Sequence, residues 1–169
     1  AHLTEGLLKP LSDLMLNRRY ADPAWQREHR RPTPGVLNGF RQADGTFLRY
    51  DIAARCVAIE SYLKTGTIGP VYRKMQRIRR HAPEGSVLLE ELSRRFEVLI
   101  SGYVKRGYDF SHPITMMSNG HLVDGAHRLA CAWYFRSPYV TVEMGACTTM
   151  MPFDRAWFEP HFSGEELGA

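Results

Sequence analysis

The chain has 169 residues, 44% of them hydrophobic, which suits one ordinary domain or a core domain with an extension. Its formal net charge of +4 comes from 22 Lys and Arg against 18 Asp and Glu, a modest excess that by itself selects no partner. No apolar run approaches the ~18 residues of a membrane span, the first residues lack a signal-peptide layout, and the three cysteines lack zinc-like spacing. We therefore expect a cytoplasmic protein without membrane spans, a disulfide framework or a Cys-rich metal site.

Residues 1–85 are expected to form a helical and irregular N-terminal extension. Apolar residues at helical spacing, Pro and Gly punctuation and the turn signal Ala43-Asp44-Gly45 define its elements. Pro70 suits the first turn of a helix. The predicted elements are a helix over residues 7–20, an irregular segment over 21–39, a β-ribbon over 39–50, and helices over 53–63 and 71–80.

Residues 86–169 are expected to form an α+β core. Ser86 is a candidate N-cap for a long amphipathic helix that Gly107 ends. Short apolar runs on either side of the Asn119-Gly120 turn signal predict strands. The predicted elements are helices over residues 86–106 and 126–135, strands over 113–117, 121–124 and 139–144, and a short helix that begins at Asp154.

The segment Asp124-Gly125-Ala126-His127-Arg128 stands where the second of these strands enters a helix. Gly125 permits a tight turn, the first helical turn offers unpaired N–H groups, and His127 and Arg128 add donors, so the junction predicts an anion site with phosphate as its natural occupant. Asp124 brings a carboxylate to the same place, which suits an anion site only with a metal ion or a substrate proton present. The combination predicts phosphoryl chemistry.

With Pro113-Ile114 and the Asn119-Gly120 turn before it, this motif resembles the ParB/sulfiredoxin superfamily over roughly residues 110–145. Ala126 stands where sulfiredoxins carry their reactive cysteine, and the Gly-Glu-Arg-Arg motif of CTP-binding ParB proteins is absent. The form Asp-Gly-x-His-Arg is closest to the free serine kinases. The resemblance implies a small mixed sheet of the ParB/sulfiredoxin type with a helical N-terminal extension. It also implies an ATP- or ADP-dependent kinase that uses Mg²⁺ and acts on a small hydroxyl-bearing metabolite such as a free amino acid.

Roles at the junction follow from this hypothesis. We predict that Gly125, Ala126, His127 and Arg128 hold the nucleotide phosphates, and that Asp124 binds Mg²⁺ or orients the acceptor hydroxyl. Asp124, His127 and Arg128 form the predicted catalytic set. The structural alternative makes Asp124 a turn residue and His127 a buried histidine at a helix start. In the resembled kinases an earlier Glu acts as base, and the sequence leaves its equivalent open among Glu60, Glu84, Glu91 and Glu97.

A second candidate group lies on the helix predicted over residues 71–80. Tyr72, Gln76 and Arg79 recur at spacings that place them on one helix face, and they are predicted to bind the substrate, with Arg79 reaching the Gly125 pocket. The alternative is that Val71, Met75 and Ile78 are buried while the polar residues border solvent. His112, His121 and His161 lack metal-site spacing and are interpreted as surface or capping residues.

Two other function classes compete with the kinase. One is a ParB-like nucleotide- or DNA-binding regulator, which basic clusters favour but which lacks a clear helix-turn-helix pair after the sheet. The other is a non-catalytic sensor of a phosphorylated metabolite. The N-terminal region is also a candidate homodimer interface. The basic clusters are Arg18, Arg19, Arg27, Arg30 and Arg31, and then Arg73, Lys74, Arg77, Arg79, Arg80 and His81.

Overall fold

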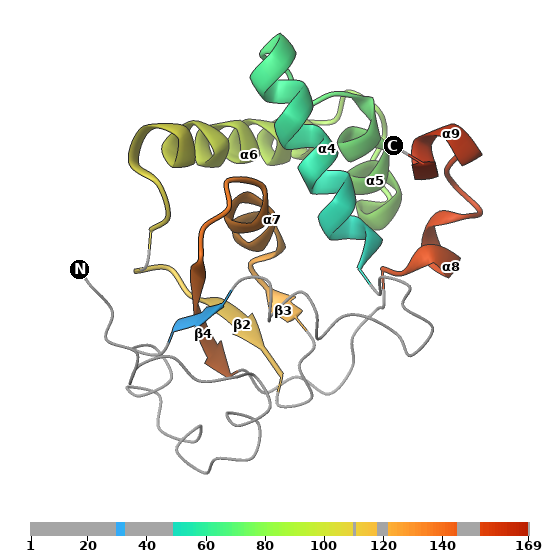
Figure 1. Cartoon of the computed structure of the whole chain (residues 1–169). Coiled ribbons are helices and arrows are strands. Elements are labelled where there is room, and N and C mark those ends of the chain that lie inside the picture. Colours follow the sequence, from blue (N-terminus) through green and yellow to red (C-terminus); the bar gives the residue numbers. More distant parts are fainter. Residues whose placement is uncertain (1–29, 33–48, 110, 118–121, 145–152, 169) are drawn as a thin grey trace.

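A computed structural model describes residues 30–32, 49–109, 111–117, 122–144 and 153–168. Within these residues a small mixed sheet is covered on one side by helices (Figure 1), so the predicted α+β class with a small mixed sheet is confirmed. The elements in chain order are β1 (Arg30–Pro32), α4 (Tyr50–Thr65), α5 (Pro70–Arg80), α6 (Val87–Arg106), β2 (Ile114–Met116), β3 (Leu122–Asp124), α7 (Ala126–Tyr134), β4 (Tyr139–Met144), α8 (Arg155–Phe158) and α9 (Gly164–Gly168).

The sheet has the strand order β1-β4-β2-β3. The two inner strands, β4 and β2, run parallel with Ile114 opposite Val142, and each outer strand pairs antiparallel with its neighbour. In the last pair Thr115 lies opposite Asp124. Asp124 therefore ends an edge strand, and the chain leaves the sheet through Gly125 into α7.

Gly125 sets how closely α7 approaches the sheet. Its φ of 93° lies in the left-handed region, which favours glycine. A Cβ at this position would lie 2.7 Å from Ile114 Cγ2 and 3.0 Å from Ile114 Cα, so the backbone of β2 occupies the space that a side chain would need. The buried face of α7, which includes Leu129 and Cys131, then packs into the common core.

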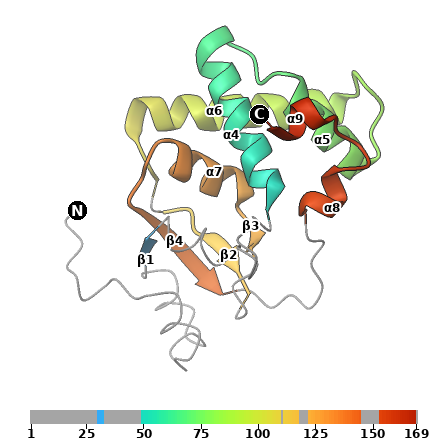
Figure 2. The ribbon, with the colours of Figure 1, turned by 45° about the vertical axis from the view of Figure 1, so that its right-hand side comes forward.

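The helices α4, α5 and α6 form a layer beyond α7, as the two ribbon views show (Figure 1, Figure 2). Small or compact side chains such as Ala58 and Ala130 are fully buried in the core that α4 and α7 share, which permits close packing of the two helices. Because α4 and α5 share one hydrophobic core with α7, the described residues 49–85 pack as one body with those that follow. None of the helices in the described part of the chain is long and apolar enough to cross a bilayer.

Local signals account for most helix ends. Pro70 occupies the first turn of α5, Ser86 caps α6 by accepting a hydrogen bond from Leu89 N at 3.4 Å, and Gly107 follows the last residue of that helix, as predicted. Asp154 caps α8 in the same manner, accepting from Trp157 N. The strands and the remaining helices over residues 70–158 lie within two residues of their predicted bounds.

Other predictions need correction. The helix expected over residues 53–63 begins at Tyr50 and ends at Thr65, so Tyr50 is helical and is not part of a β-ribbon. The strand β1 lies in the segment predicted to be irregular, because its only ladder partner is the distant strand β4. The short helix α9 was not predicted. The helix predicted over residues 7–20 and the ribbon up to residue 48 lie outside the described residues.

The C-terminal segment returns to α5. Figure 2 shows α8 and α9 beside that helix. Lys74 Nζ of α5 donates to Glu166 Oε2 at 2.9 Å and lies 4.7 Å from the centroid of the Phe162 ring. These contacts place the aromatic residues of the segment next to the second basic cluster.

Candidate functional site

A cavity of about 530 Å³ opens at the start of α7. It lies between α6, the end of α5 and the junction that follows β3. Its wall combines an apolar side from α6 with charged and polar groups from several elements. The apolar side consists of Leu92, Phe96, Leu99 and Tyr103, and the polar groups are Arg80, Arg95, Asp109, His112, Asp124, His127 and Arg128.

The first turn of α7 has backbone N–H groups that are free to bind an anion. Gly125 is the N-cap and has no side chain with which to accept a hydrogen bond. The first helical bond runs from Leu129 N to Gly125 O at 2.8 Å, so the three preceding N–H groups, from Ala126 to Arg128, have no acceptor within the helix. Together with the helix dipole, these groups favour a negative charge in the cavity.

Arg128 is positioned by hydrogen bonds to Pro113 and Asp124. Its Nη2 donates to the Pro113 carbonyl at 3.0 Å and to Asp124 Oδ2 at 3.3 Å. Its buried Nε has no partner among the described residues. The Asp124 side chain is 75% exposed, so its carboxylate remains open to a cation or a substrate at the mouth of the cavity.

His127 is held from behind by Tyr72, whose Oη lies 2.8 Å from His127 Nε2. Burial raises the pKa of Tyr72, so its phenol keeps the proton. When that phenol donates to Nε2, the imidazole proton of a neutral His127 lies on Nδ1. The Phe96 ring packs edge-on against the imidazole, with centroids 4.7 Å apart, and fixes its plane.

His127 is neutral at physiological pH. Burial lowers its pKa well below the ordinary value, and the charges of Arg55, Arg79 and Arg128 lower it further. A neutral imidazole contributes one N–H donor to a bound phosphate and no charge. The positive charge in the cavity comes from the arginines.

This neutrality predicts a pH dependence of stability. The unfolded histidine takes up a proton near pH ~6.5, whereas the folded one stays neutral to lower pH. The contribution of His127 is thus complete above the unfolded pKa and is lost as the pH falls toward the folded pKa. Urea unfolding at pH 7.5, 6.5 and 5.5 should show a decline in the free energy of unfolding that His127→Gln reduces. Identical pH dependence in both proteins would contradict the assignment.

A buried ion cluster supports the junction from the α4 side. Arg49 donates to both carboxylate oxygens of Asp51, at 2.7 and 2.9 Å, and to the Leu122 carbonyl of β3 at 3.1 Å. Arg55 Nη1 donates to Asp51 Oδ2 at 3.0 Å. Asp51 and Arg55 are almost fully buried, at 0% and 1% exposure. The cluster ties the start of α4 to the strand that carries Asp124.

A pair of residues that the sequence did not single out as catalytic, Asp109 and His112, lies in the same cavity. Asp109 Oδ2 is 2.8 Å from His112 Nδ1, and Asp109 Oδ1 accepts from Ser111 N at 2.9 Å. Hydrogen bonds from Ser111, and then from His112, lower the pKa of Asp109 to about 2. The carboxylate therefore orients the imidazole and leaves Nε2 open to accept a proton. Their i,i+3 spacing just before a predicted strand was the available signal.

The four glutamates left open as a base do not line the cavity. Glu60 pairs with Lys64, Glu91 pairs with Arg94 and Arg95, and Glu84 lies 3.7 Å from Arg73 and 3.6 Å from Arg77. The carboxylates that reach it are Asp109 and Asp124.

The three residues predicted to bind substrate occupy different positions. Tyr72 and Gln76 are buried, at 0% and 1% exposure, so the alternative that they border solvent is wrong. Tyr72 contacts His127 from behind and does not line the cavity. Arg79 points into a second cavity, where its guanidinium lies 3.9 Å from the centroid of the Phe153 ring.

The side chains at the first cavity limit how a metal ion could be held there. Among the residues that the structure describes, no group of three or more His, Cys, Asp and Glu side chains could hold an ion. Asp124 alone offers an exposed carboxylate beside the helix N-terminus. That set fits Mg²⁺ carried by nucleotide phosphates, because this ion needs only one or two protein carboxylates when phosphates and water complete its shell. Cys56 and Cys131 are free thiols.

No protein-family model, curated protein or solved structure matches the chain.

Proposed function

We propose that the protein is a nucleotide-dependent phosphotransferase that acts on a small hydroxyl-bearing metabolite such as a free amino acid. One observation carries the proposal: the open N-terminus of α7 faces a cavity that also contains Arg80, Arg128 and an exposed Asp124. Phosphoryl transfer depends mainly on positioning and on neutralising charge, and this set supplies both. The resemblance of Asp-Gly-x-His-Arg to the free serine kinases, and with it a ParB/sulfiredoxin type of sheet, supports the same conclusion.

In this proposal the phosphates of ATP or ADP lie against the N–H groups of Ala126, His127 and Arg128. The Nδ1–H of neutral His127 and the Arg128 guanidinium donate to their oxygens. Asp124 would hold Mg²⁺ together with those phosphates, and the ion would neutralise charge on the transferred group. Tyr72 keeps His127 in the tautomer that donates, so it is a positioning residue.

In this proposal His112, oriented by Asp109, acts as the general base. The acceptor hydroxyl attacks the terminal phosphorus, its oxygen forms the new P–O bond, and the bond between that phosphorus and the bridging oxygen breaks. The hydroxyl proton passes to His112 Nε2 and then to water, while the bridging oxygen leaves on the nucleotide. The products are a phosphate ester and a nucleotide that is shorter by one phosphate.

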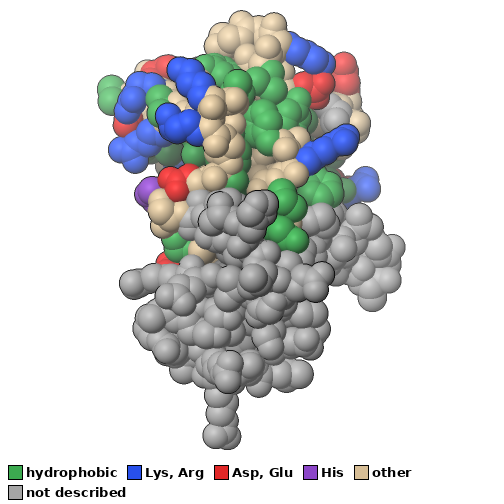
Figure 3. Space-filling view, turned by 60° about the vertical axis from the view of Figure 1, so that its left-hand side comes forward, with side chains coloured by type: hydrophobic (Ala, Val, Ile, Leu, Met, Phe, Trp, Pro, Cys, Tyr) green, Lys and Arg blue, Asp and Glu red, His purple; other side chains and the backbone are tan. Residues whose placement is uncertain are grey.

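The basic cluster on α5 gives less support to a DNA-binding regulator. Arg73 pairs with Glu90, Arg77 approaches Glu84, and Lys74 pairs with Glu166. In Figure 3 the Lys and Arg side chains of the helical part are interspersed with acidic and hydrophobic ones. A surface of mixed sign offers fewer unpaired cations to a phosphate backbone than a continuous basic stripe does.

The test is calorimetric titration with ATP, ADP and CTP, each with and without Mg²⁺. We expect micromolar binding of an adenine nucleotide that is lost in Arg128→Ala and weakened in Arg80→Ala. Arg94→Ala is the matched control, because Arg94 lies on the exposed side of α6 and pairs with Glu91. Since Arg128 also bonds the Pro113 carbonyl, thermal unfolding of each variant separates lost binding from lost fold.

The outcomes separate the three function classes. Binding of an adenine nucleotide followed by phosphorylation of hydroxylated metabolites would establish the kinase. Selective binding of CTP would favour the ParB-like regulator, and adenine nucleotide binding without transfer to any acceptor would favour the sensor. Failure of all three nucleotides to bind would refute the proposal.

A further inference from the structure

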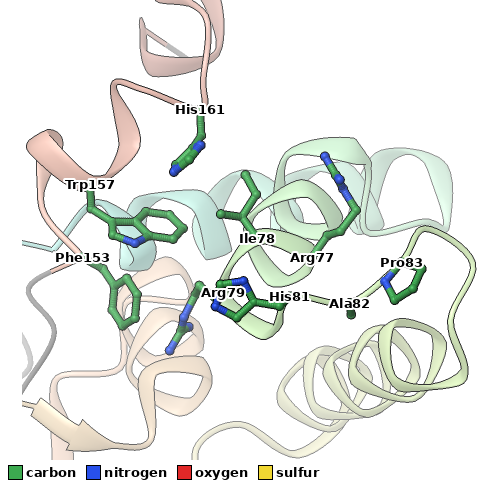
Figure 4. Close-up of a pocket in the computed structure, with 9 residues that line it drawn as sticks. All are labelled: Arg77, Ile78, Arg79, His81, Ala82, Pro83, Phe153, Trp157 and His161. Atoms are coloured by element: carbon green, nitrogen blue, oxygen red, sulfur yellow. The ribbon is translucent and has the colours of Figure 1, made fainter.

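A second cavity, of about 640 Å³, lies between the end of α5 and the C-terminal segment. Figure 4 shows two walls of different origin. Phe153, Trp157 and His161 of the C-terminal segment form an aromatic wall, with the first two rings 5.2 Å apart and edge-on. The opposite wall comes from α5 and the turn after it, where Arg79 lies between Phe153 and His81 in the picture.

Arg79 contributes a positive charge that forms no ion pair with a carboxylate among the described residues. One face of its guanidinium covers the Phe153 ring, and its buried Nε has no hydrogen-bond partner in the described part of the chain. The nearest buried carboxylate, Asp51, already binds Arg49 and Arg55. Burial, and then the charge of Arg55, lower the pKa of Arg79 to about 10, so the group remains charged but would gain from a nearby anion.

The other basic residue of α5 at this cavity differs from Arg79. Arg77 Nε lies 3.6 Å from Glu84 Oε2, so a carboxylate already balances its charge. Among the described residues that line the cavity there is no Asp or Glu. The described residues thus offer one unbalanced guanidinium beside two aromatic rings, a combination that matches a single negative charge and a flat apolar group.

We propose that this cavity binds a small carboxylate that carries a planar ring, at a site separate from the cavity that we assign to phosphoryl transfer. The guanidinium of Arg79 pairs with the carboxylate, and Trp157 with Ile78 encloses the ring. The binding of this compound does not rest on the proposed function. The volume is in the ordinary range for small-molecule sites.

The positions of Arg79 and Arg80 link the two cavities. These neighbouring residues line different cavities, Arg79 the second and Arg80 the first, and the charges of both lower the pKa of His127. An anion beside Arg79 therefore acts on the electrostatics of the phosphate site.

The experiment is calorimetric titration with 4-hydroxybenzoate and acetate on the full chain, without nucleotide. We expect 4-hydroxybenzoate to bind at least about tenfold more tightly than acetate. Arg79→Gln should weaken that binding about tenfold or more, because a charge-assisted pair is lost. Arg94→Gln is the matched control and should leave it unchanged.

A second variant distinguishes loss of the ligand site from loss of the fold. Trp157→Leu should remove most of the preference for the ring while the affinity for acetate stays the same, and circular dichroism checks the fold of each variant. Absence of 4-hydroxybenzoate binding at millimolar concentration, or binding that is indifferent to Arg79→Gln, would overturn the inference. Binding of 4-hydroxybenzoate by a protein that binds no nucleotide would support the ligand site and refute the phosphotransferase.

Discussion

Replacing Asp51 by Ala is expected to lower the free energy of unfolding by about 3–5 kcal/mol, a large part of the ~5–15 kcal/mol that stabilises a typical domain. Asp51 is fully buried and accepts hydrogen bonds from Arg49 and Arg55. Its removal leaves the Arg55 guanidinium buried without its carboxylate, and it also releases the arginine that joins α4 to β3. Urea unfolding monitored by circular dichroism measures the loss.

The matched control is Glu60→Ala on the same helix. Glu60 pairs with Lys64 across one turn, but both side chains are more than half exposed, so solvent screens the pair and little change is expected. If both variants lost the same free energy of unfolding, the loss would come from substitution within helix α4 and not from removal of the buried carboxylate.

The same carboxylate predicts sensitivity to acid. Burial alone would raise the pKa of Asp51, but the hydrogen bond from Arg49 and the charges of Arg55 and Arg49 outweigh it and hold the pKa below its ordinary value. The stabilising contribution is therefore present above the unfolded pKa and is lost as the pH falls through the folded one.

Gly125→Ala is expected to destabilise the protein by about 3 kcal/mol and to abolish nucleotide binding. The backbone must either keep a φ of 93° with a side chain, which is strained, or rotate and turn the start of α7 away. The added Cβ would also meet Ile114 at 2.7 Å, and one of the nearby atoms belongs to the backbone of β2. Unfolding and nucleotide titration together measure the two effects.

The variant Gly66→Ala separates backbone strain from contact with Ile114 as causes of the lost stability. Gly66 ends α4 with a φ of 78°, in the same left-handed region, but a Cβ there would meet nothing within 4 Å. We expect a loss of about 1 kcal/mol from backbone strain alone. If both variants lost the same stability, contact with Ile114 would have no role in the choice of glycine at position 125.

Prediction from sequence succeeded where the determinants lie within one turn of the residue concerned. Pro70, Ser86 and Gly107 mark helix ends because each acts on its own backbone. The start of α4 was missed for the converse reason. Its N-cap, Arg49, makes no side-chain capping bond, and its guanidinium instead binds Asp51 and the distant Leu122 carbonyl. The contact between Arg49 and the Leu122 carbonyl spans 73 residues of sequence, so no local pattern predicts the residue at which this helix begins.

The sequence by itself determined the junction between β3 and α7, since Gly125, His127 and Arg128 are neighbours and act through one tight turn and one helix start. Only the tertiary structure decided what surrounds it. Tyr72 reaches His127 across 55 residues of sequence, and the Asp109 and His112 pair lies in the same cavity because α6 and β2 converge there. Arg79 instead faces the returning C-terminal segment. Such contacts depend on how distant elements pack, and no periodicity or capping signal encodes them.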